Sequence, residues 1–589
     1  MAVLGVDVGG TFTDAVLLSE GELRTAKVAT ARRQEESVLA ATEAVGAGAE
    51  AVERFTHGTT VATNALLERK GARTAFVATE GFEHLLHLRR QNRAHLYRLC
   101  AAHPEPLVPL ERCHGVRERI SADGVVTPLD LASVPELEDV EAVAVCLLFS
   151  FRDSSHEQAV AEELQRRLPG ARVVASHEVA PEFREYERAS TTAIDAYLGP
   201  TVSGYLEALR EAAAGAGLPE PLVMRSSGGV ASLAEAAEHP AVALVSGPAA
   251  GVVGAARIAR LVGVENAISL DMGGTSTDVC LIAGGEVGRS AEREVAGLPL
   301  RLPMVDLQTV GAGGGSLVWR DAGRALRVGP ESAGADPGPA CYGRGGARPT
   351  VTDANLLLGR LPERLAGGLE LDRRAAERAF AGLDPAEAVE VVNAEMLRAL
   401  RLVSIERGHD PRDFALVAFG GAGPLHACEL ADELGIETVL VPEAAGVLSA
   451  VGLAVSDERR DRVESFVCPL EEAGELPAEG ETDLRYRGQS FELTVPLGPD
   501  LATAFHRAHE ARYGYADRER PIELVAVRTA EVRAGPELRL PAAEPLEERG
   551  PAVLELPGAT CWIPPGWVGV RDGSSSTLWL TKVSRNCGN

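Results

Sequence analysis

An eight-residue segment occurs twice in this chain, and the repeat limits the possible folds more than any other feature. Residues 7–14 read DVGGTFTD and residues 271–278 read DMGGTSTD, so six of the eight positions are identical. Each copy follows a short apolar run and precedes another, as in two strands joined by a tight turn. Glycine N–H groups and threonine hydroxyls in such a turn donate hydrogen bonds to an anion. The repeat therefore predicts two phosphate-binding β-hairpins, one in each half of a chain that grips a nucleotide.

The residues of the two hairpins divide into a metal side and a phosphate side. Asp7 and Asp271 open the turns and repel phosphate, and a Mg²⁺ ion between carboxylate and phosphate removes this conflict. We expect Asp7, Thr11, Asp271 and Thr275 to carry catalysis, with Asp7 and Asp271 at the metal. The expected phosphate ligands are the glycines and threonines of both turns: Gly9, Gly10, Thr11, Thr13, Gly273, Gly274, Thr275 and Thr277. Two ordinary tight turns are the alternative, and the duplication argues against it.

A glycine-rich turn late in the chain is the candidate for adenosine binding. An apolar run at residues 415–419 leads into Gly-Gly-Ala-Gly-Pro and then into a segment rich in small residues. Backbone exposed in this way can lie flat against a base or ribose at the start of a helix. Taken alone, a plain strand–helix connection explains the pattern as well. Since the turn follows two phosphate hairpins, we expect it to bind adenosine through Gly420, Gly421, Ala422, Gly423 and Pro424.

Several weaker candidates could face the substrate. They are polar or glycine residues near expected helix starts and turns: His57, Thr59, Thr60, Arg89, Asp306 and Gly313. Each has a plainer interpretation. Thr59 or Thr60 could only cap a helix, and the basic run at residues 89–93 could be a solvated helix face or a partner contact instead of a substrate contact. The glycine run at residues 311–315 could be a flexible loop.

Length and composition indicate a multidomain globular protein. The chain has 589 residues, and we expect domains at residues 1–190 and 191–460, each with one hairpin, and a β-rich region at residues 461–589. Residues 75–78 and 143–149 are predicted strands. Predicted helices cover residues 34–45, 156–168, 248–261, 372–380 and 385–407, and residues 536–550 form a predicted loop.

The charge and motif content exclude several function classes. A net charge of −27 argues against a nucleic-acid or anionic-membrane surface. With no signal peptide and no apolar run long enough for a bilayer, we expect a cytoplasmic enzyme. The nine Cys residues are dispersed, which fits reduced thiols. The chain has only three Lys, no Walker A loop, no GxSxG elbow and no HExxH motif.

Longer strings give the chain a family resemblance. The two Asp-x-Gly-Gly-Thr hairpins and the late Gly-Gly-Ala-Gly turn resemble the actin, Hsp70 and sugar-kinase superfamily. The sequence is similar to the hydantoinase A/oxoprolinase family at residues 5–14, 57–66, 246–254, 269–278, 306–316, 334–342, 419–427 and 446–452. The resemblance implies an α/β fold of two ribonuclease-H-like halves around an ATP cleft, with a small β-rich C-terminal domain. The segment at residues 533–549 is shorter than the family pattern, and residues 572–589 match nothing in it.

The resemblance also implies an activity. Members of the family use ATP to phosphorylate the oxygen of a cyclic amide, such as a hydantoin or 5-oxoproline, and water then opens the ring. They usually work with a hydantoinase B-type subunit, which implies a hetero-oligomer. Three alternatives stay open: an acetone-carboxylase-type subunit that phosphorylates a ketone or bicarbonate, a small-molecule kinase of the same superfamily, and an ATPase whose output is conformational.

Overall fold

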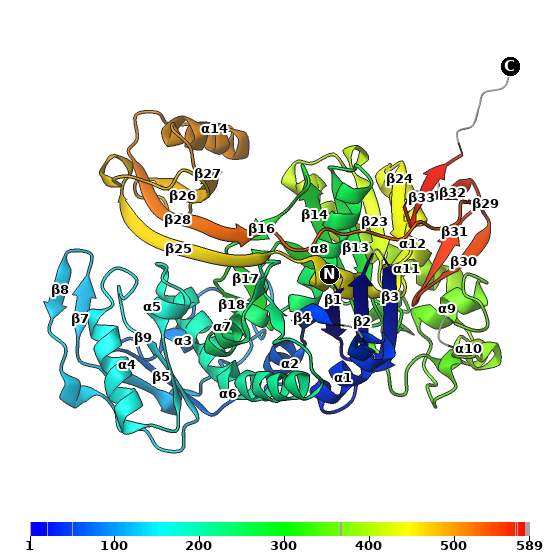
Figure 1. The fold of residues 1–589 in the computed structure, drawn as a ribbon. Coiled ribbons are helices and arrows are strands. Elements are labelled where there is room, and N and C mark those ends of the chain that lie inside the picture. Colours follow the sequence, from blue (N-terminus) through cyan, green and yellow to red (C-terminus); the bar gives the residue numbers. More distant parts are fainter. Residues whose placement is uncertain are drawn as a thin grey trace.

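Two large β-sheets form the centre of the molecule and lie beside each other in Figure 1. The computed structural model describes residues 2–583 except residues 21, 50, 366, 367, 572 and 574. Within this part of the chain, one sheet has ten strands and the other has nine. Both are mixed sheets, so each contains antiparallel hairpins and parallel crossovers.

The first sheet is built around the N-terminal hairpin. Its strand order is β3-β2-β1-β4-β11, in which β1, β2 and β3 are antiparallel and β4 and β11 continue parallel to β1. This is the ribonuclease-H-like order. The bounds are β1 Ala2–Val8, β2 Phe12–Ser19, β3 Glu22–Ala29, β4 Val52–Gly58 and β11 Leu222–Met224.

The second sheet repeats this plan around the second hairpin. Its order is β15-β14-β13-β23-β24, again with an antiparallel hairpin followed by two parallel strands. The bounds are β13 Ala267–Met272, β14 Thr277–Ala283, β15 Glu286–Val287, β23 Ala415–Phe419 and β24 Thr438–Pro442. The prediction of an α/β fold with two related halves is therefore confirmed.

Two helices cross between the sheets at small residues. They are α8 (Ser246–Leu261) and α13 (Leu448–Val455); all of α13 except Ser449 is buried, and so are more than half of the residues of α8. A Cβ on Gly254 of α8 would lie 2.7 Å from the carbonyl oxygen of Leu448, and one on Gly452 of α13 would overlap the backbone of Ala250. Glycine therefore lets the two helix backbones touch at the junction of the halves.

A smaller parallel sheet forms a lobe beside the first half, at the lower left of Figure 1. Its strands are β6 (Cys113–Val116), β5 (Thr74–Thr79), β9 (Ala142–Cys146) and β10 (Arg172–Ala175). The helices α4 (Ser155–Arg167) and α6 (Glu185–Gly215) pack against this sheet. The sequence predicted both ends of β5, β9 and α4 to within three residues. It also predicted α1 (Gln34–Ala44).

Strands after residue 457 extend both large sheets. Four of them join the first sheet through β12 (Val230–Ala231): β25 Glu458–Pro469, β26 Glu481–Tyr486, β27 Leu493–Pro496 and β28 Ile522–Arg533. Three others join the second sheet beside β24: β29 Leu546–Arg549, β32 Trp567–Arg571 and β33 Thr577–Lys582. The region is β-rich as expected, and β29 lies inside the segment predicted as a loop. Boundaries at residues 190 and 460 stay a proposal, and this pairing favours assigning the C-terminal strands to the two halves.

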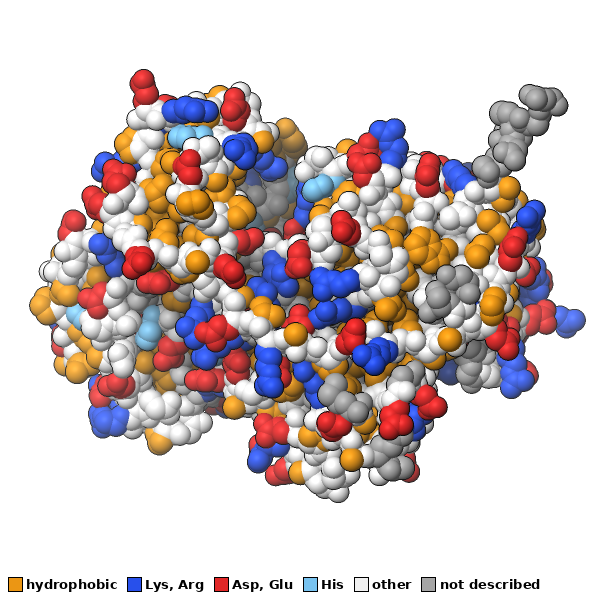
Figure 2. Space-filling view, turned by 45° about the horizontal axis from the view of Figure 1, so that its top comes forward, with side chains coloured by type: hydrophobic (Ala, Val, Ile, Leu, Met, Phe, Trp, Pro, Cys, Tyr) orange, Lys and Arg blue, Asp and Glu red, His pale blue; other side chains and the backbone are white. Residues whose placement is uncertain are grey.

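Charge and hydrophobicity of the exterior fit a globular protein. Acidic and basic side chains are interspersed on the face shown in Figure 2, so the excess negative charge is not gathered into one patch there. Among the described residues, no helix combines the length and hydrophobicity that crossing a membrane requires.

Candidate nucleotide site

The turns of the two hairpins have the same geometry. In the first, the N–H of Gly9 donates to the carbonyl of Phe12 at 2.9 Å, and in the second, Gly273 donates to Ser276 at 3.0 Å. The residues at the tips reach solvent: Gly10, Gly274 and Thr275 are exposed, and Thr11 is half-buried. These groups are thus available to an anion, as the sequence predicted.

Four aspartates line the two hairpins. The strand register places Asp7 opposite Asp14 and Asp271 opposite Asp278, so each pair shares one face of its hairpin. Burial and then the charge of Asp14 raise the pKa of Asp7 to about 7. Burial, Asp278 and then Asp7 raise the pKa of Asp271 to about 8. The charges of Asp7 and Asp14 in the first half also contribute to the raised pKa of Asp271 in the second half, which is consistent with two turns that face each other.

Lys27 is the cation at this group of acids. Its Nζ lies 2.5 Å from Oδ1 of Asp14 and 5.4 Å from the ring centroid of Phe12, and its charge lowers the pKa of both Asp7 and Asp271. Sequence reasoning missed Lys27. Its rarity in a chain with three Lys was the only signal.

The start of helix α8 faces Asp7. A Cβ on Gly247 would lie 3.4 Å from Oδ1 of Asp7, and one on Gly58, the last residue of β4, would lie 2.6 Å from the same oxygen. The hydroxyl of Ser246 donates to the carbonyl of Thr59 at 3.0 Å and fixes the helix start. The positive end of this 16-residue helix therefore adjoins the first turn, where it favours negative charge. The sequence indicated the helix but not this contact.

The glycine run at residues 311–315 supports the second turn. Gly314 N–H donates to the carbonyl of Gly273 at 3.0 Å, and Gly315 N–H donates to that of Gly274 at 2.6 Å. A Cβ on Gly313 would lie 2.7 Å from the nitrogen of Thr275. The structure thus brings Gly313 to the candidate site, against the phosphate hairpin.

The expected adenosine loop also packs against the second hairpin. Gly420 directly follows β23 and has a φ of +77°, and a Cβ there would overlap Oδ1 of Asp271. Ala422 N–H donates to the carbonyl of Met272 at 3.0 Å, and α12 (Gly423–Leu434) begins directly afterwards. Gly421 is exposed, Ala422 is half-buried, and Gly423 and Pro424 are buried in the helix start. The loop therefore lies beside the phosphate turns, and its binding of adenosine stays a prediction.

A C-terminal hairpin also lies next to the candidate site. It consists of β30 (Ala552–Leu556) and β31 (Ala559–Ile563), with Gly558 in the turn. A Cβ on Gly446 would come within 2.5 Å of the carbonyl oxygen of Gly558, and one on Gly558 would lie 3.2 Å from Cε of Lys27. The hairpin tip therefore contacts both halves next to the site. Sequence reasoning did not place it there.

Two of the expected phosphate ligands turn inward. Thr277 is fully buried, and its hydroxyl donates to the carbonyl of Ala312 at 2.6 Å. Thr13 is also buried and lies 3.1 Å from the hydroxyl of Thr30, which donates to Gly9. We now expect both hydroxyls to hold the turns from behind, and Thr11 and Thr275 to meet the ligand.

Three of the substrate-side candidates lie in the protein interior near the first turn. His57 is enclosed, with Nδ1 3.2 Å from the carbonyl of Val6 and Nε2 2.8 Å from the hydroxyl of Tyr205. Burial lowers the pKa of His57 to about 4, so it is neutral. Thr59 accepts from the N–H of Val61 at 3.1 Å, at the start of α2 (Val61–Leu67), which fits the capping interpretation. Oγ1 of Thr60 is buried and has no hydrogen-bond partner among the described residues.

The other two candidates are committed to other contacts. Arg89 donates to the carbonyls of Pro104 and Gly297, the latter at 3.4 Å. Asp306 forms an ion pair with Arg407, whose Nη2 lies 3.1 Å from Oδ1. Neither side chain bonds to a hairpin turn within the described chain, so a substrate role for them stays a prediction.

The donor set fits Mg²⁺ only in combination with phosphate. No group of three or more His, Cys, Asp or Glu side chains in the described chain is arranged to hold a metal ion. Oδ1 of Asp7 is shielded from solvent and receives no hydrogen bond from any described residue. A carboxylate that is buried beside like charges is a good ligand for a hard cation, and water and phosphate oxygens supply the remaining ligands that Mg²⁺ prefers.

The fold and these turns are typical of α/β proteins that hold a nucleotide between two ribonuclease-H-like halves. Comparison with known proteins defines the family more closely. Residues 3–168 match the N-terminal region of the hydantoinase/oxoprolinase family, and residues 188–462 match its hydantoinase/oxoprolinase domain. The chain belongs to the hydantoinase/oxoprolinase family.

Relatives in this family cover most of the chain. Caprolactamase subunit alpha of Pseudomonas jessenii is 33% identical over 96% of this chain and 97% of that protein. The crystal structure of this ATP-dependent caprolactamase superimposes with a TM-score of 0.88 and 31% identity, covering 98% of this chain and 99% of the other. Acetophenone carboxylase gamma subunit of Aromatoleum aromaticum is 35% identical over 77% of this chain and 68% of its own. 5-Oxoprolinase 1 of Arabidopsis thaliana is 36% identical over 69% of this chain and 36% of its own.

Proposed function

We propose that this chain uses ATP to phosphorylate the carbonyl oxygen of a cyclic amide, such as a hydantoin or 5-oxoproline, and so drives ring opening by water. The observation that carries the proposal is the duplicated turn: Asp7 and Asp271 occupy the same register position in two hairpins of the same turn geometry, one in each half. The whole-length similarity to caprolactamase subunit alpha supports the choice of substrate class.

The chemistry needs positioning more than a strong base. The amide oxygen attacks the γ-phosphorus of ATP, the bond from phosphorus to the bridging oxygen breaks, and ADP leaves. Water then adds to the activated carbon, and the carbon–nitrogen bond breaks as the nitrogen takes a proton. The acyl phosphate that results reacts with a second water to give the carboxylate and phosphate. Because the amide oxygen carries no proton, its phosphorylation calls for alignment and charge neutralisation.

The residues of the site would divide this work. Thr11, Thr275 and the N–H groups of Gly10 and Gly274, which lie at the solvent-accessible turn tips, would donate to phosphate oxygens. Asp7 and Asp271 would hold Mg²⁺, which neutralises phosphate charge when bound. Lys27 and the start of α8 add positive potential on the side of the first half.

The proposal includes a second subunit and a cytoplasmic location. Two of the relatives are named as subunits, caprolactamase alpha and acetophenone carboxylase gamma. We therefore propose that the chain works in a hetero-oligomer with a hydantoinase B-type subunit, in the compartment that supplies ATP.

An isotope experiment tests the reaction directly. The chain and the B-type subunit are incubated with ATP and hydantoin, N-methylhydantoin, 5-oxoproline or caprolactam, each labelled with ¹⁸O at the carbonyl. ADP release that depends on one of these compounds, with the label in phosphate, is expected. Ring opening with unlabelled phosphate would contradict transfer of the amide oxygen to phosphorus followed by attack of water at the acyl carbon. A stable phosphorylated product without ring opening would instead indicate a kinase.

A second candidate is phosphorylation of a ketone or bicarbonate. The similarity to acetophenone carboxylase gamma subunit favours it, since that relative also covers most of this chain. ADP release that requires acetone or acetophenone together with bicarbonate, and no cyclic amide, would replace the first proposal by this one.

A further inference from the structure

A long loop of the small lobe presents apolar side chains to solvent. It comprises residues 91–103 and follows α3 (Leu85–Leu88). Leu96, Tyr97 and Leu99 are 66%, 88% and 86% exposed, although side chains of this kind are normally buried. These three side chains lie within four consecutive residues of the segment 91–102, which is exposed throughout, and they are called the loop tip here.

The base of this loop is firmly held. Arg90 donates to both carboxylate oxygens of Glu187 on α6, and His103 lies 2.9 Å from the carbonyl of Asn92 across the neck of the loop. His87, just before the loop, lies 3.0 Å from the carbonyl of Val108, just after it. The loop is therefore a built projection whose two ends are fixed to the lobe.

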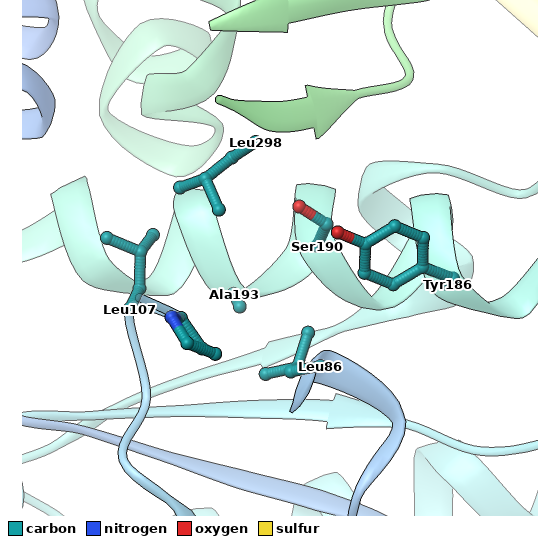
Figure 3. A pocket seen from close by; sticks show the side chains of 7 residues that line it. Leu86, Leu107, Tyr186, Ser190, Ala193 and Leu298 are labelled. Atoms are coloured by element: carbon teal, nitrogen blue, oxygen red, sulfur yellow. The ribbon is translucent and has the colours of Figure 1, made fainter. Parts of the chain in front are cut away.

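Packing under the loop explains this attachment. Figure 3 shows Leu86 and Leu107, from the two sides of the loop, around Tyr186, Ser190 and Ala193 of α6. The cavity between them has a volume of about 10 Å³, which is about the space of one water molecule. It is too small for a cyclic amide, so this region anchors the loop and does not hold substrate.

The charge of the loop contrasts with that of the chain. Residues 84–104 contain four Arg and four His and neither Asp nor Glu, in a protein with a net charge of −27. In the described structure, neither Arg93 nor Arg98 forms an ion pair with a carboxylate. The tip is therefore apolar with an unneutralised basic rim, which is complementary to an apolar pocket edged by acids.

We infer that the 91–103 loop is the docking element for a different subunit, the hydantoinase B-type partner. The chain is similar to caprolactamase subunit alpha over 97% of that protein, which is named as a subunit, so we expect the partner of this chain to be a separate polypeptide. A second copy of this chain is a poorer occupant, because two bodies with net charges of −27 repel each other. The identity of the partner rests on the proposed function; the docking element rests on the loop itself.

The test compares two variants in which exposed apolar side chains are replaced by Asp. Leu96→Asp/Tyr97→Asp/Leu99→Asp changes the loop tip, and Val125→Asp/Val126→Asp changes exposed apolar residues on β8 (Gly124–Thr127) of the same lobe, which are 52% and 63% exposed. Each is mixed with the B-type subunit of the same organism, and assembly is followed by light scattering. The loop variant is expected to bind at least 100-fold more weakly, while the β8 variant binds like wild type. Equal nucleotide affinity of all three chains shows that the variants are folded.

A second measurement uses the unmodified chain. Cys100 in the loop is exposed, so a maleimide labels it, and mass spectrometry of its peptide gives the labelling rate. Assembly with the B-type subunit is expected to slow this rate at least tenfold.

Several outcomes would overturn the inference. These are no complex with the wild-type chain, equal weakening by both variants, unchanged binding of the loop variant, or unprotected Cys100 in the complex. A homo-oligomer of the wild-type chain that the loop variant abolishes would assign the tip to a second copy. Loop-dependent assembly without lactam-driven ADP release would contradict the proposed function and leave the docking element intact.

Discussion

At the scale of single residues, the state of Asp7 and Asp271 is the main feature of the site. With pKa values of about 7 and 8, both carboxyl groups take up protons near neutral pH when no cation is present. Burial beside other acids, not a hydrogen-bonding partner, produces this state. The site is therefore least stable when it is empty and both carboxyl groups are ionised. A bound cation would offset the repulsion between these charges.

Replacement of either aspartate should remove activity. Asp7→Asn and Asp271→Asn keep the shape of the side chain but remove the charge that would hold the metal. Substrate-dependent ADP release is expected to fall about 10²–10³-fold or more. Asp123→Asn, at an exposed position, is the control and should leave the rate unchanged. Full activity in either of the first two variants would exclude the assigned role.

The same carboxyl groups predict a pH dependence of stability. A carboxyl group whose pKa is higher in the folded than in the unfolded chain binds more protons when folded, so its contribution to stability is lost as pH rises from about 4 to about 8. In EDTA without nucleotide, the Tm of the wild-type chain should therefore fall more steeply over this range than that of Asp7→Asn/Asp271→Asn. Parallel Tm curves would show that the two carboxyl groups are not perturbed.

Sequence reasoning found these residues because the repeat carries them, and it missed others for a physical reason. Asp7, Asp271 and the turn glycines are local to the motif. Lys27 and Gly247 become part of the site through contacts between elements, which no local pattern encodes. His57, a weak substrate-side candidate from the sequence, lies inside the protein, where its Nε2 is 2.8 Å from the hydroxyl of Tyr205; its burial also depends on contacts between distant elements.

At the scale of elements, the C-terminal hairpin β30–β31 connects the halves next to the site. Its turn touches Gly446 in the second half and Lys27 in the first. The β-rich character of this region was predictable from its short alternating runs. The division of these strands between two sheets was not predictable. Pairing between strands so distant in sequence depends on tertiary packing, which no local pattern encodes.

A substitution beneath the hairpin turn tests this connection. In Gly446→Ala, the added Cβ would meet the backbone of Gly558 and push the turn away from Lys27. We expect ATP affinity to fall on the order of tenfold and Tm to decrease, because backbone cannot yield as a flexible side chain does. Gly204→Ala, at an exposed position inside α6 with open space around it, should keep ATP affinity and slightly raise Tm. Equal ATP affinity in the two variants would show that the hairpin turn does not contribute to ATP binding.

At the scale of the whole molecule, the halves meet through α8 and α13, which pack at small residues. We expect each half to move as a body at this junction, so that the two turns approach each other when a nucleotide bridges them. Closure of the two halves around one nucleotide therefore stays a prediction, as it was from the sequence.

Closure is measurable in solution. Small-angle scattering should give a smaller radius of gyration with Mg²⁺ and a non-hydrolysable ATP analogue than without nucleotide, and protease sensitivity should decrease. Asp7→Asn/Asp271→Asn should show neither change at the same concentrations. Unchanged scattering and proteolysis of the wild-type chain would contradict closure around the nucleotide.

The pairing of β33 with β24 has a consequence for how the protein is made. Val439 pairs with Leu580, so the edge of β24 stays open until β33 (Thr577–Lys582) has been synthesised. During synthesis the N-terminal half can fold early, but its neighbour waits with an unpaired strand edge that other chains can bind. We therefore expect the growing polypeptide to be prone to aggregation until residues 577–582 have been made, and a chain shortened before residue 577 to accumulate in the insoluble fraction.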